Sequence, residues 1–100
     1  MAELPKTIED LYKIGSRQEG HIIEIRSPPN YKSLHGFIRI PSVSGKLFFQ
    51  ESLSGIQKRE IGKYHEGATV QFSVDKGSKG FFAKAVYIKV RHTFFELLHA

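Results

Sequence analysis

The sequence lacks several features that would point to particular classes of protein. It contains no cysteine, which excludes a disulfide framework and any thiolate metal site. No apolar run approaches the roughly 18 residues of a membrane span, and the first residues, Met1 to Lys6, are too polar for a signal peptide. We therefore expect a soluble, cytoplasmic protein with no membrane contact, stabilised by packing and by backbone hydrogen bonds.

Sequence motifs of catalysis are missing as well. There is no nucleophile elbow, and Gly77-Ser78-Lys79-Gly80 lacks the strand-to-helix context of a phosphate-binding loop. The five histidines form no i,i+4 pair on a helix and have no thiolate companions. Glu24 and Glu51 would form a carboxylate pair if their strands were neighbours, but no other pattern supports acid–base chemistry, and we expect both to be solvated. The sequence predicts no enzymatic activity, no cofactor and no bound metal.

The chain does contain an excess of positive charge within an ordinary globular composition. Lys and Arg number 15 against 10 Asp and Glu, which gives a formal charge of +5, and hydrophobic residues make up 40% of the chain. A chain of 100 residues forms one domain with a core of modest size. The positive charge favours an anionic partner.

Short segments rich in β-branched and alternating apolar residues predict strands with no long helix between them. The expected strands are His21–Ile25, Leu34–Ile40, Lys46–Gln50, Val70–Val74 and Phe81–Val90. A long irregular connection, residues 52–67, follows the third strand, and a turn rich in Gly and Lys, residues 75–80, follows the fourth. This arrangement is typical of an antiparallel sandwich or barrel.

Helical segments are expected only at the two ends of the chain. Thr7 as N-cap, Asp10 at the third helical position and Gly15 as C-cap predict a short helix over residues 7–15. The last residues have the Thr-x-x-Glu form of another capping box. The sequence therefore predicts an N-terminal helical extension over residues 1–19, a barrel over residues 20–90 and a C-terminal helical tail over residues 91–100.

The C-terminal tail carries apolar side chains that need a partner. They either pack on the N-terminal helix or the floor of the barrel, or they contact a partner protein or a second copy of the chain. The residues concerned are Phe94, Phe95, Leu97 and Leu98.

The two-residue period of extended chain separates the faces of the second and third expected strands. Phe37 and Arg39 share one face of the second strand. Phe48 lies on one face of the third strand, and Leu47 and Phe49 lie on the other. We expect these rings on the surface, while the opposite assignment of the faces would place them in the core.

Three segments occur in an order and spacing that resembles a known family. They are His35-Gly36-Phe37-Ile38-Arg39-Ile40, Leu47-Phe48-Phe49-Gln50-Glu51-Ser52 and Gly77-Ser78-Lys79-Gly80. With Gly20 opening the first strand and residues 70–74 as the fourth, residues 20 to about 90 resemble a cold-shock domain. The resemblance implies an all-β, five-stranded antiparallel barrel of the oligonucleotide/oligosaccharide-binding (OB) type, which also suits a long connection after the third strand.

The resemblance also implies a function, which is non-catalytic binding of single-stranded nucleic acid, with RNA expected as the ligand ahead of DNA. In this family bases stack on surface rings, and Lys and Arg neutralise the phosphates. The expected nucleic-acid-binding residues are Phe37, Phe48, His35, Arg39, Lys32, Lys46, Gln50, Lys79 and Phe82. Further candidates near them are Tyr31, Tyr64 and Phe81.

Phe82 stands where the family usually has a polar or small residue. Its ring would extend the stacking surface toward the loop between the fourth and fifth strands, beside Lys79, or it would pack against the tail.

Two carboxylates depart from the family pattern. Glu24 stands where the family has its first-strand Trp, and Glu51 where it has the second aromatic residue of the third strand. A carboxylate repels phosphates, so we expect affinity of micromolar order, about −8 kcal/mol, or weaker. These carboxylates and the apolar tail favour an alternative function, a cold-shock-like barrel that has lost nucleic-acid binding and serves as a protein–protein interaction module.

Overall fold

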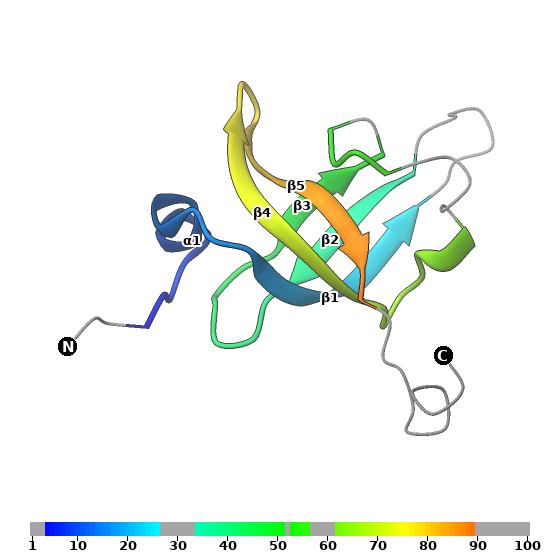
Figure 1. Ribbon diagram of the computed structural model, residues 1–100, viewed down its shortest axis with the longest axis horizontal. Coiled ribbons are helices and arrows are strands. Elements are labelled where there is room, and N and C mark those ends of the chain that lie inside the picture. The colour runs from blue at the N-terminus through cyan, green and yellow to red at the C-terminus, as the bar shows by residue number, and fades with distance from the viewer. Residues whose placement is uncertain (1–3, 27–33, 52, 57–61, 90–100) are drawn as a thin grey trace, which may run out of the picture.

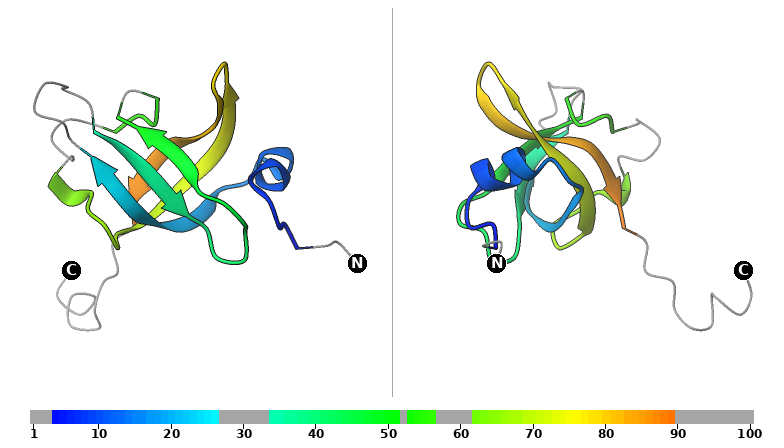
Figure 2. Two further views of the ribbon diagram at one scale, coloured as in Figure 1. Left: turned by 180° about the vertical axis from the view of Figure 1, so that it is seen from behind. Right: turned by 60° about the vertical axis from the view of Figure 1, so that its left-hand side comes forward.

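Alternating apolar and polar residues form the strands of a closed barrel (Figure 1). The computed structural model describes residues 4–26, 34–51, 53–56 and 62–89. Its elements are the helix α1 (Ile8–Ile14) and the strands β1 (Gln18–Arg26), β2 (His35–Arg39), β3 (Leu47–Gln50), β4 (Thr69–Gly77) and β5 (Gly80–Ile88). Around the barrel the strands follow the order β1-β2-β3-β5-β4 (Figure 2). The prediction of an all-β, five-stranded barrel after a short helix is confirmed.

One strand pair corrects the prediction of an antiparallel barrel. Four of the neighbouring pairs are antiparallel, whereas β3 and β5 run parallel and pair at Phe48 and Phe82. Strand directions cannot alternate all the way around a closed ring with an odd number of members. A barrel of five strands must therefore contain a parallel pair, and here the pair lies where β5 closes the barrel against β3.

The faces of the strands follow the predicted alternation. In β2 and β3, Ile38 and Phe49 are 0% exposed in the core, while Phe37 and Phe48 are half-buried on the outer wall. The assignment that would place Phe37 and Phe48 in the core is therefore wrong. The apolar core consists of the buried residues Leu11, Ile22, Leu34, Ile38, Ile40, Val43, Leu47, Phe49, Ile56, Tyr64, Ala68, Val70, Phe72, Val74, Ala83 and Val86.

Close approach of β1 and β2 requires glycine at one position of β2. The pairing register of these strands shifts between Ile22 and Glu24, which marks a bulge in β1. At Gly36 a Cβ atom would lie 2.0 Å from the backbone oxygen of Glu24 and 2.9 Å from the Phe49 ring. Neither neighbour can move without disturbing the pairing of β1 and β2 or the core.

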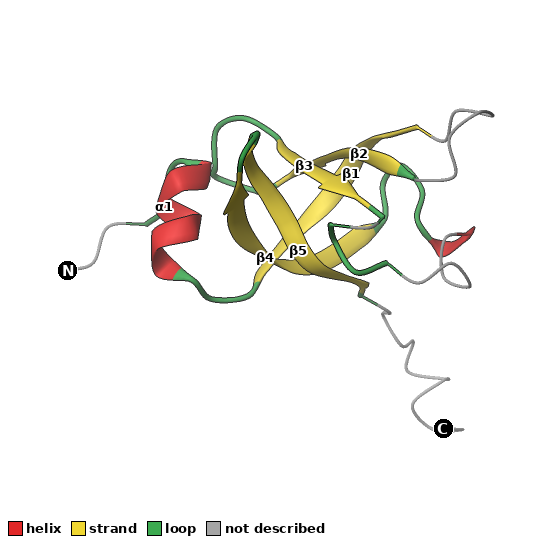
Figure 3. Cartoon of the chain, turned by 90° about the horizontal axis from the view of Figure 1, so that it is seen from above, coloured by secondary structure: helices red, strands yellow, loops and turns green. Residues whose placement is uncertain are grey.

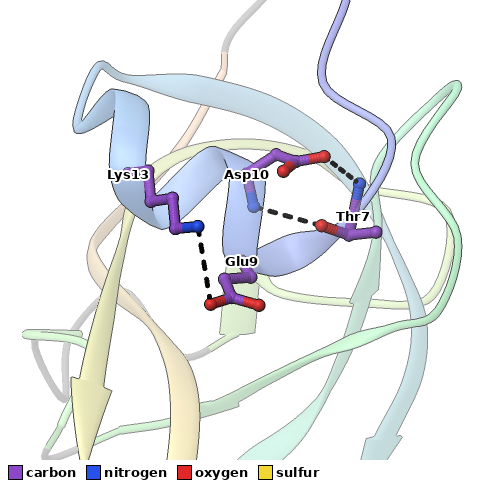
Figure 4. Close-up of polar contacts among 4 residues, drawn as sticks. All are labelled: Thr7, Glu9, Asp10 and Lys13. Carbon is purple, nitrogen blue, oxygen red and sulfur yellow. Dashed lines mark hydrogen bonds and ion pairs between the residues drawn. The ribbon is translucent and has the colours of Figure 1, made fainter.

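The helix α1 begins and ends as its sequence predicts. The Asp10 backbone N–H donates to the Thr7 hydroxyl at 3.1 Å, and the Asp10 carboxylate accepts from the Thr7 N–H at 3.1 Å (Figure 4). Gly15 ends the helix in the left-handed region, with φ of 74°. Lys13 and Glu9 form an exposed i,i+4 ion pair at 3.7 Å.

Hydrogen bonds to Asp10 hold the pKa of its carboxyl below the ordinary value. The largest cause is the backbone N–H of Lys6, which donates to Asp10 at 3.0 Å, followed by the groups of Thr7. The charged cap is therefore present at neutral pH, and its contribution to stability disappears as the pH falls through this lowered pKa.

One face of α1 packs against the barrel, beside β4 and β5 (Figure 3). Leu11 is buried, Ile8 packs against the core, and the Tyr12 ring lies 5.4 Å from the Phe81 ring.

Within the described ranges, no helix has the length and apolar character needed to cross a membrane. The predicted C-terminal helix falls in residues 90–100, which lie outside the described part of the chain.

We expect the Gly36→Ala substitution to destabilise the fold by about 1–3 kcal/mol, because the added methyl group collides with the Glu24 backbone. Urea unfolding followed by circular dichroism measures this change. Gly62→Ala is the matched control, since a Cβ there meets no atom within 4 Å, and its effect should stay within about 0.5 kcal/mol. Equal stability of the two variants would contradict the assigned approach of β1 and β2.

Candidate nucleic-acid interface

Three phenylalanines lie side by side on the outer wall of the barrel. Phe37 pairs with Phe48 across β2 and β3, and Phe48 pairs with Phe82 across β3 and β5. Paired residues on neighbouring strands point to the same side of a sheet, so these half-buried rings form one surface, which we call the phenylalanine row. Glu24 continues the row on β1 and Asp75 on β4, one carboxylate at each end.

The Phe37 and Phe48 rings of the row do not stack face to face on one another. Phe37 and Phe48 meet edge to face, with centroids 5.9 Å apart and planes inclined by 64°. The His35 ring lies 6.5 Å from that of Phe48 at 41°. Phe37 and Phe48 are both half-buried, so part of each residue remains exposed to solvent on this wall.

A second line of residues, which includes the predicted His35 and Gln50, runs beside the phenylalanine row. Arg26, His35 and Gln50 pair across β1, β2 and β3. His35 and Gln50 are half-buried and Arg26 is exposed. The structure thus brings His35 and Gln50 next to Phe37 and Phe48.

The carboxylate at the β1 end is compensated by two cations. An Arg26 nitrogen lies 2.8 Å from Glu24 Oε1, and Lys46 Nζ lies 3.9 Å from Glu24 Oε2. The same Lys46 nitrogen lies 4.0 Å from the centroid of the Phe37 ring, a cation–π distance. Glu24 therefore lies on the predicted face but is not an isolated negative charge there.

The other predicted cations lie apart from one another. Arg39 is exposed on the same face of β2 as Phe37, and Lys79 is exposed in the two-residue turn between β4 and β5. Neither forms an ion pair with another residue in the described part of the chain. Lys32, predicted to contact phosphate, falls outside the described residues, as does Tyr31.

Sequence reasoning missed the carboxylate at the β4 end. Asp75 was expected in a turn, but β4 runs on to Gly77 and places Asp75 opposite Phe82, where it pairs with Lys84 at 3.6 Å. The alternation that ends in the buried Val74 would have carried the strand one step further, to an outward Asp75.

Glu51 is not on this surface, which corrects the prediction that it would be solvated and face the nucleic acid. β3 ends at Gln50, and the chain turns inward, with the Glu51 N–H donating to the Leu34 carbonyl at 2.8 Å. The side chain is only 8% exposed, and its Oε1 has no hydrogen-bond partner among the described residues. Glu24 lies on β1 and Glu51 follows β3. Because β2 lies between these two strands, the two carboxylates do not come from neighbouring strands.

Two further aromatic candidates, Tyr64 and Phe81, take part in packing of the core. Tyr64 is buried in the core, and its hydroxyl donates to the Val86 carbonyl at 3.1 Å. Phe81 packs against the core beneath Tyr12. Tyr64 is therefore not part of the surface on which Phe37 and Phe48 lie.

Ser54 fixes β3 against β5 and so positions the row. This side chain is 0% exposed. Its hydroxyl donates to the Ala83 carbonyl of β5 at 2.6 Å and accepts from the Gln50 N–H of β3 at 3.1 Å. Its backbone carbonyl accepts from the Val86 N–H at 2.9 Å.

In comparisons with known proteins, no family model matches the chain and no curated protein is significantly similar to it. Among the described residues, no group of three or more His, Cys, Asp and Glu side chains could hold a metal ion.

We expect Ser54→Ala to destabilise the protein by about 1–3 kcal/mol, because a part-buried N–H and a buried carbonyl each lose a partner. The matched control is Ser44→Ala, whose hydroxyl contacts the Lys6 carbonyl at an exposed site and should change stability by less than about 0.5 kcal/mol. Urea unfolding of both variants measures the difference. A Ser54→Ala protein as stable as the control would show that this hydroxyl does not hold β3 to β5.

Proposed function

We propose that this protein binds single-stranded nucleic acid, with RNA as the first expected ligand and DNA as the second, by stacking bases on the phenylalanine row. The observation that carries the proposal is the alignment of Phe37, Phe48 and Phe82 across three neighbouring strands on an outer wall. Base–aromatic stacking contributes about 1–3 kcal/mol per base and tolerates any base, because every base has a π-face. Three rings are consistent with a dissociation constant of micromolar order after the cost of ordering the strand.

The charges around the row suit a polyanion. The formal charge of the chain is +5, and the two carboxylates at the ends of the row are both ion-paired. In the proposed complex Lys46, Arg39 and Lys79 neutralise phosphates, and Lys46 exchanges its contact with Glu24 for one with the strand.

The architecture supports an OB-type barrel similar to a cold-shock domain. The strand order β1-β2-β3-β5-β4 closes a ring in which the connection after β3 is the long one. In OB barrels the face of the second and third strands and the loop between the fourth and fifth bind oligonucleotides. The phenylalanine row and Lys79 occupy these places.

The alternative proposal, a protein-interaction module, has lost one of its arguments. It rested on two carboxylates in the expected binding face, and one of them, Glu51, is buried. Its other argument is the apolar tail, which lies in residues 90–100 outside the described part of the chain.

Fluorescence anisotropy with labelled oligo-U, oligo-dT and a duplex control tests the proposed function. We expect saturable binding of the single strands, little binding of the duplex, and an affinity that falls about tenfold or more between about 50 and about 200 mM salt. An apolar protein contact would hardly respond to salt. No binding of either single strand at tens of micromolar protein would overturn the proposal and direct attention to a protein partner.

Phe48→Ala and Phe82→Ala should each weaken oligo-U binding by about 1–3 kcal/mol, because each removes a stacking surface. The matched control is Tyr87→Ala, which removes a ring that is 61% exposed on β5 but lies outside the row. Its affinity should equal that of the wild type, and thermal unfolding followed by circular dichroism checks that all three variants fold. The proposal fails if the folded Phe48 and Phe82 variants bind as tightly as the Tyr87 variant.

A further inference from the structure

A hollow of ≈ 500 Å³ opens at the β5 end of the phenylalanine row. It lies between the end of β3, the turn that follows it and the β4–β5 turn. Its lining residues are Phe48, Gln50, Leu53, Gly77, Ser78, Lys79, Gly80, Phe81 and Phe82. Phe48 and Phe82 belong both to the row and to the lining of the hollow. A nucleic-acid strand that crosses the row would therefore reach the hollow without leaving the surface of the protein.

Two glycines flank the β4–β5 turn that borders the hollow. The β4–β5 turn consists of Ser78 and Lys79. Gly80 follows it with a backbone φ of 116°, a conformation that residues other than glycine rarely adopt. At Gly77 a Cβ atom would lie 3.3 Å from the Phe82 ring, so glycine lets that ring lie close to the end of β4. A larger residue at either glycine would strain the turn or crowd the ring.

Gln50 supplies a hydrogen-bonding group in the wall of the hollow. Its backbone is fixed, because its N–H donates to the Ser54 hydroxyl and its carbonyl accepts from the Ser54 N–H at 2.8 Å. Its half-buried side-chain amide forms no hydrogen bond to any residue that the structure describes. An amide offers two donors and an acceptor, the complement of a nucleobase edge.

We propose that this hollow binds one nucleobase turned out of the stacked strand, and that Gln50 recognises the hydrogen-bonding edge of this base. The proposal rests on the proposed function and adds base preference at one position. The combination of rings, one amide and the Lys79 ammonium suits a base with its phosphate, because a base needs both a flat apolar contact and edge partners. The volume falls within the range of small-molecule sites, about 300–1,000 Å³.

Base preference should therefore be confined to one nucleotide and should depend on Gln50. The test uses RNA hexamers of uridine in which one position at a time carries A, C or G, with affinity measured by anisotropy on the full chain. We expect one position at which the four bases differ by about fivefold or more, the discrimination typical of a good amide–base pair. At the other positions the four bases should agree within about twofold.

Gln50→Met keeps the length of the side chain and removes its donors and acceptor. We expect the preferred base to lose its advantage in this variant, while hexamers with the other bases bind as before. Gln50→Glu leaves only acceptors, so the preference should move to a base that presents a donor, such as the amino group of cytosine. Gln71→Met, at an exposed position of β4 opposite Tyr87, is the matched control and should keep the preference of the wild type.

Three results would overturn the proposal. Equal binding of all hexamers to the wild type would leave stacking on the row intact and exclude base recognition in the hollow. A preference that survives unchanged in the folded Gln50→Met and Gln50→Glu proteins would place base recognition elsewhere. Absence of binding to any hexamer would overturn the proposed function as well, which distinguishes that failure from the other two.

Discussion

One buried hydroxyl group joins the two strands on which the candidate interface depends. β3 has only four residues and pairs with β5 at a single residue pair, Phe48 with Phe82. Ser54 adds side-chain hydrogen bonds to both strands from a fully buried position. Buried hydrogen bonds of this kind are costly to leave unmade, so the barrel closes in one register. The position of Phe82 beside Phe48, and of Gln50 beside the hollow, follows from that register.

The wall built in this way combines apolar rings with charges that are already compensated. Phe37, Phe48 and Phe82 lie between Glu24 and Asp75, and each carboxylate has a cation beside it. Uncompensated carboxylates would repel a phosphate backbone, whereas ion-paired ones mark the two ends of the row without a large repulsive field. Stacking in the middle and phosphate contacts at the margins are then compatible on one surface.

The alternation of apolar and polar residues within single strands predicted part of the candidate interface. The two-residue period placed Phe37 and Phe48 outward because Ile38 and Phe49 belong to the core, and the capping residues bounded α1. The pattern within one strand does not predict which distant segments pair, because the parallel contact of Phe48 with Phe82 depends on how the barrel closes. Glu51 was misplaced because the chain leaves β3 after Gln50, and Asp75 because β4 continues to Gly77.

The most direct test of the account is an NMR titration of the protein, with labelled phenylalanine and tyrosine rings, by oligo-U. If the row is one binding surface, the ring signals of Phe37, Phe48 and Phe82 should shift together with a single dissociation constant, while those of Tyr87, exposed on β5 outside the row, stay in place. Shifts confined to Tyr87 or to Phe94 and Phe95, with the three rings of the row unchanged, would contradict the account.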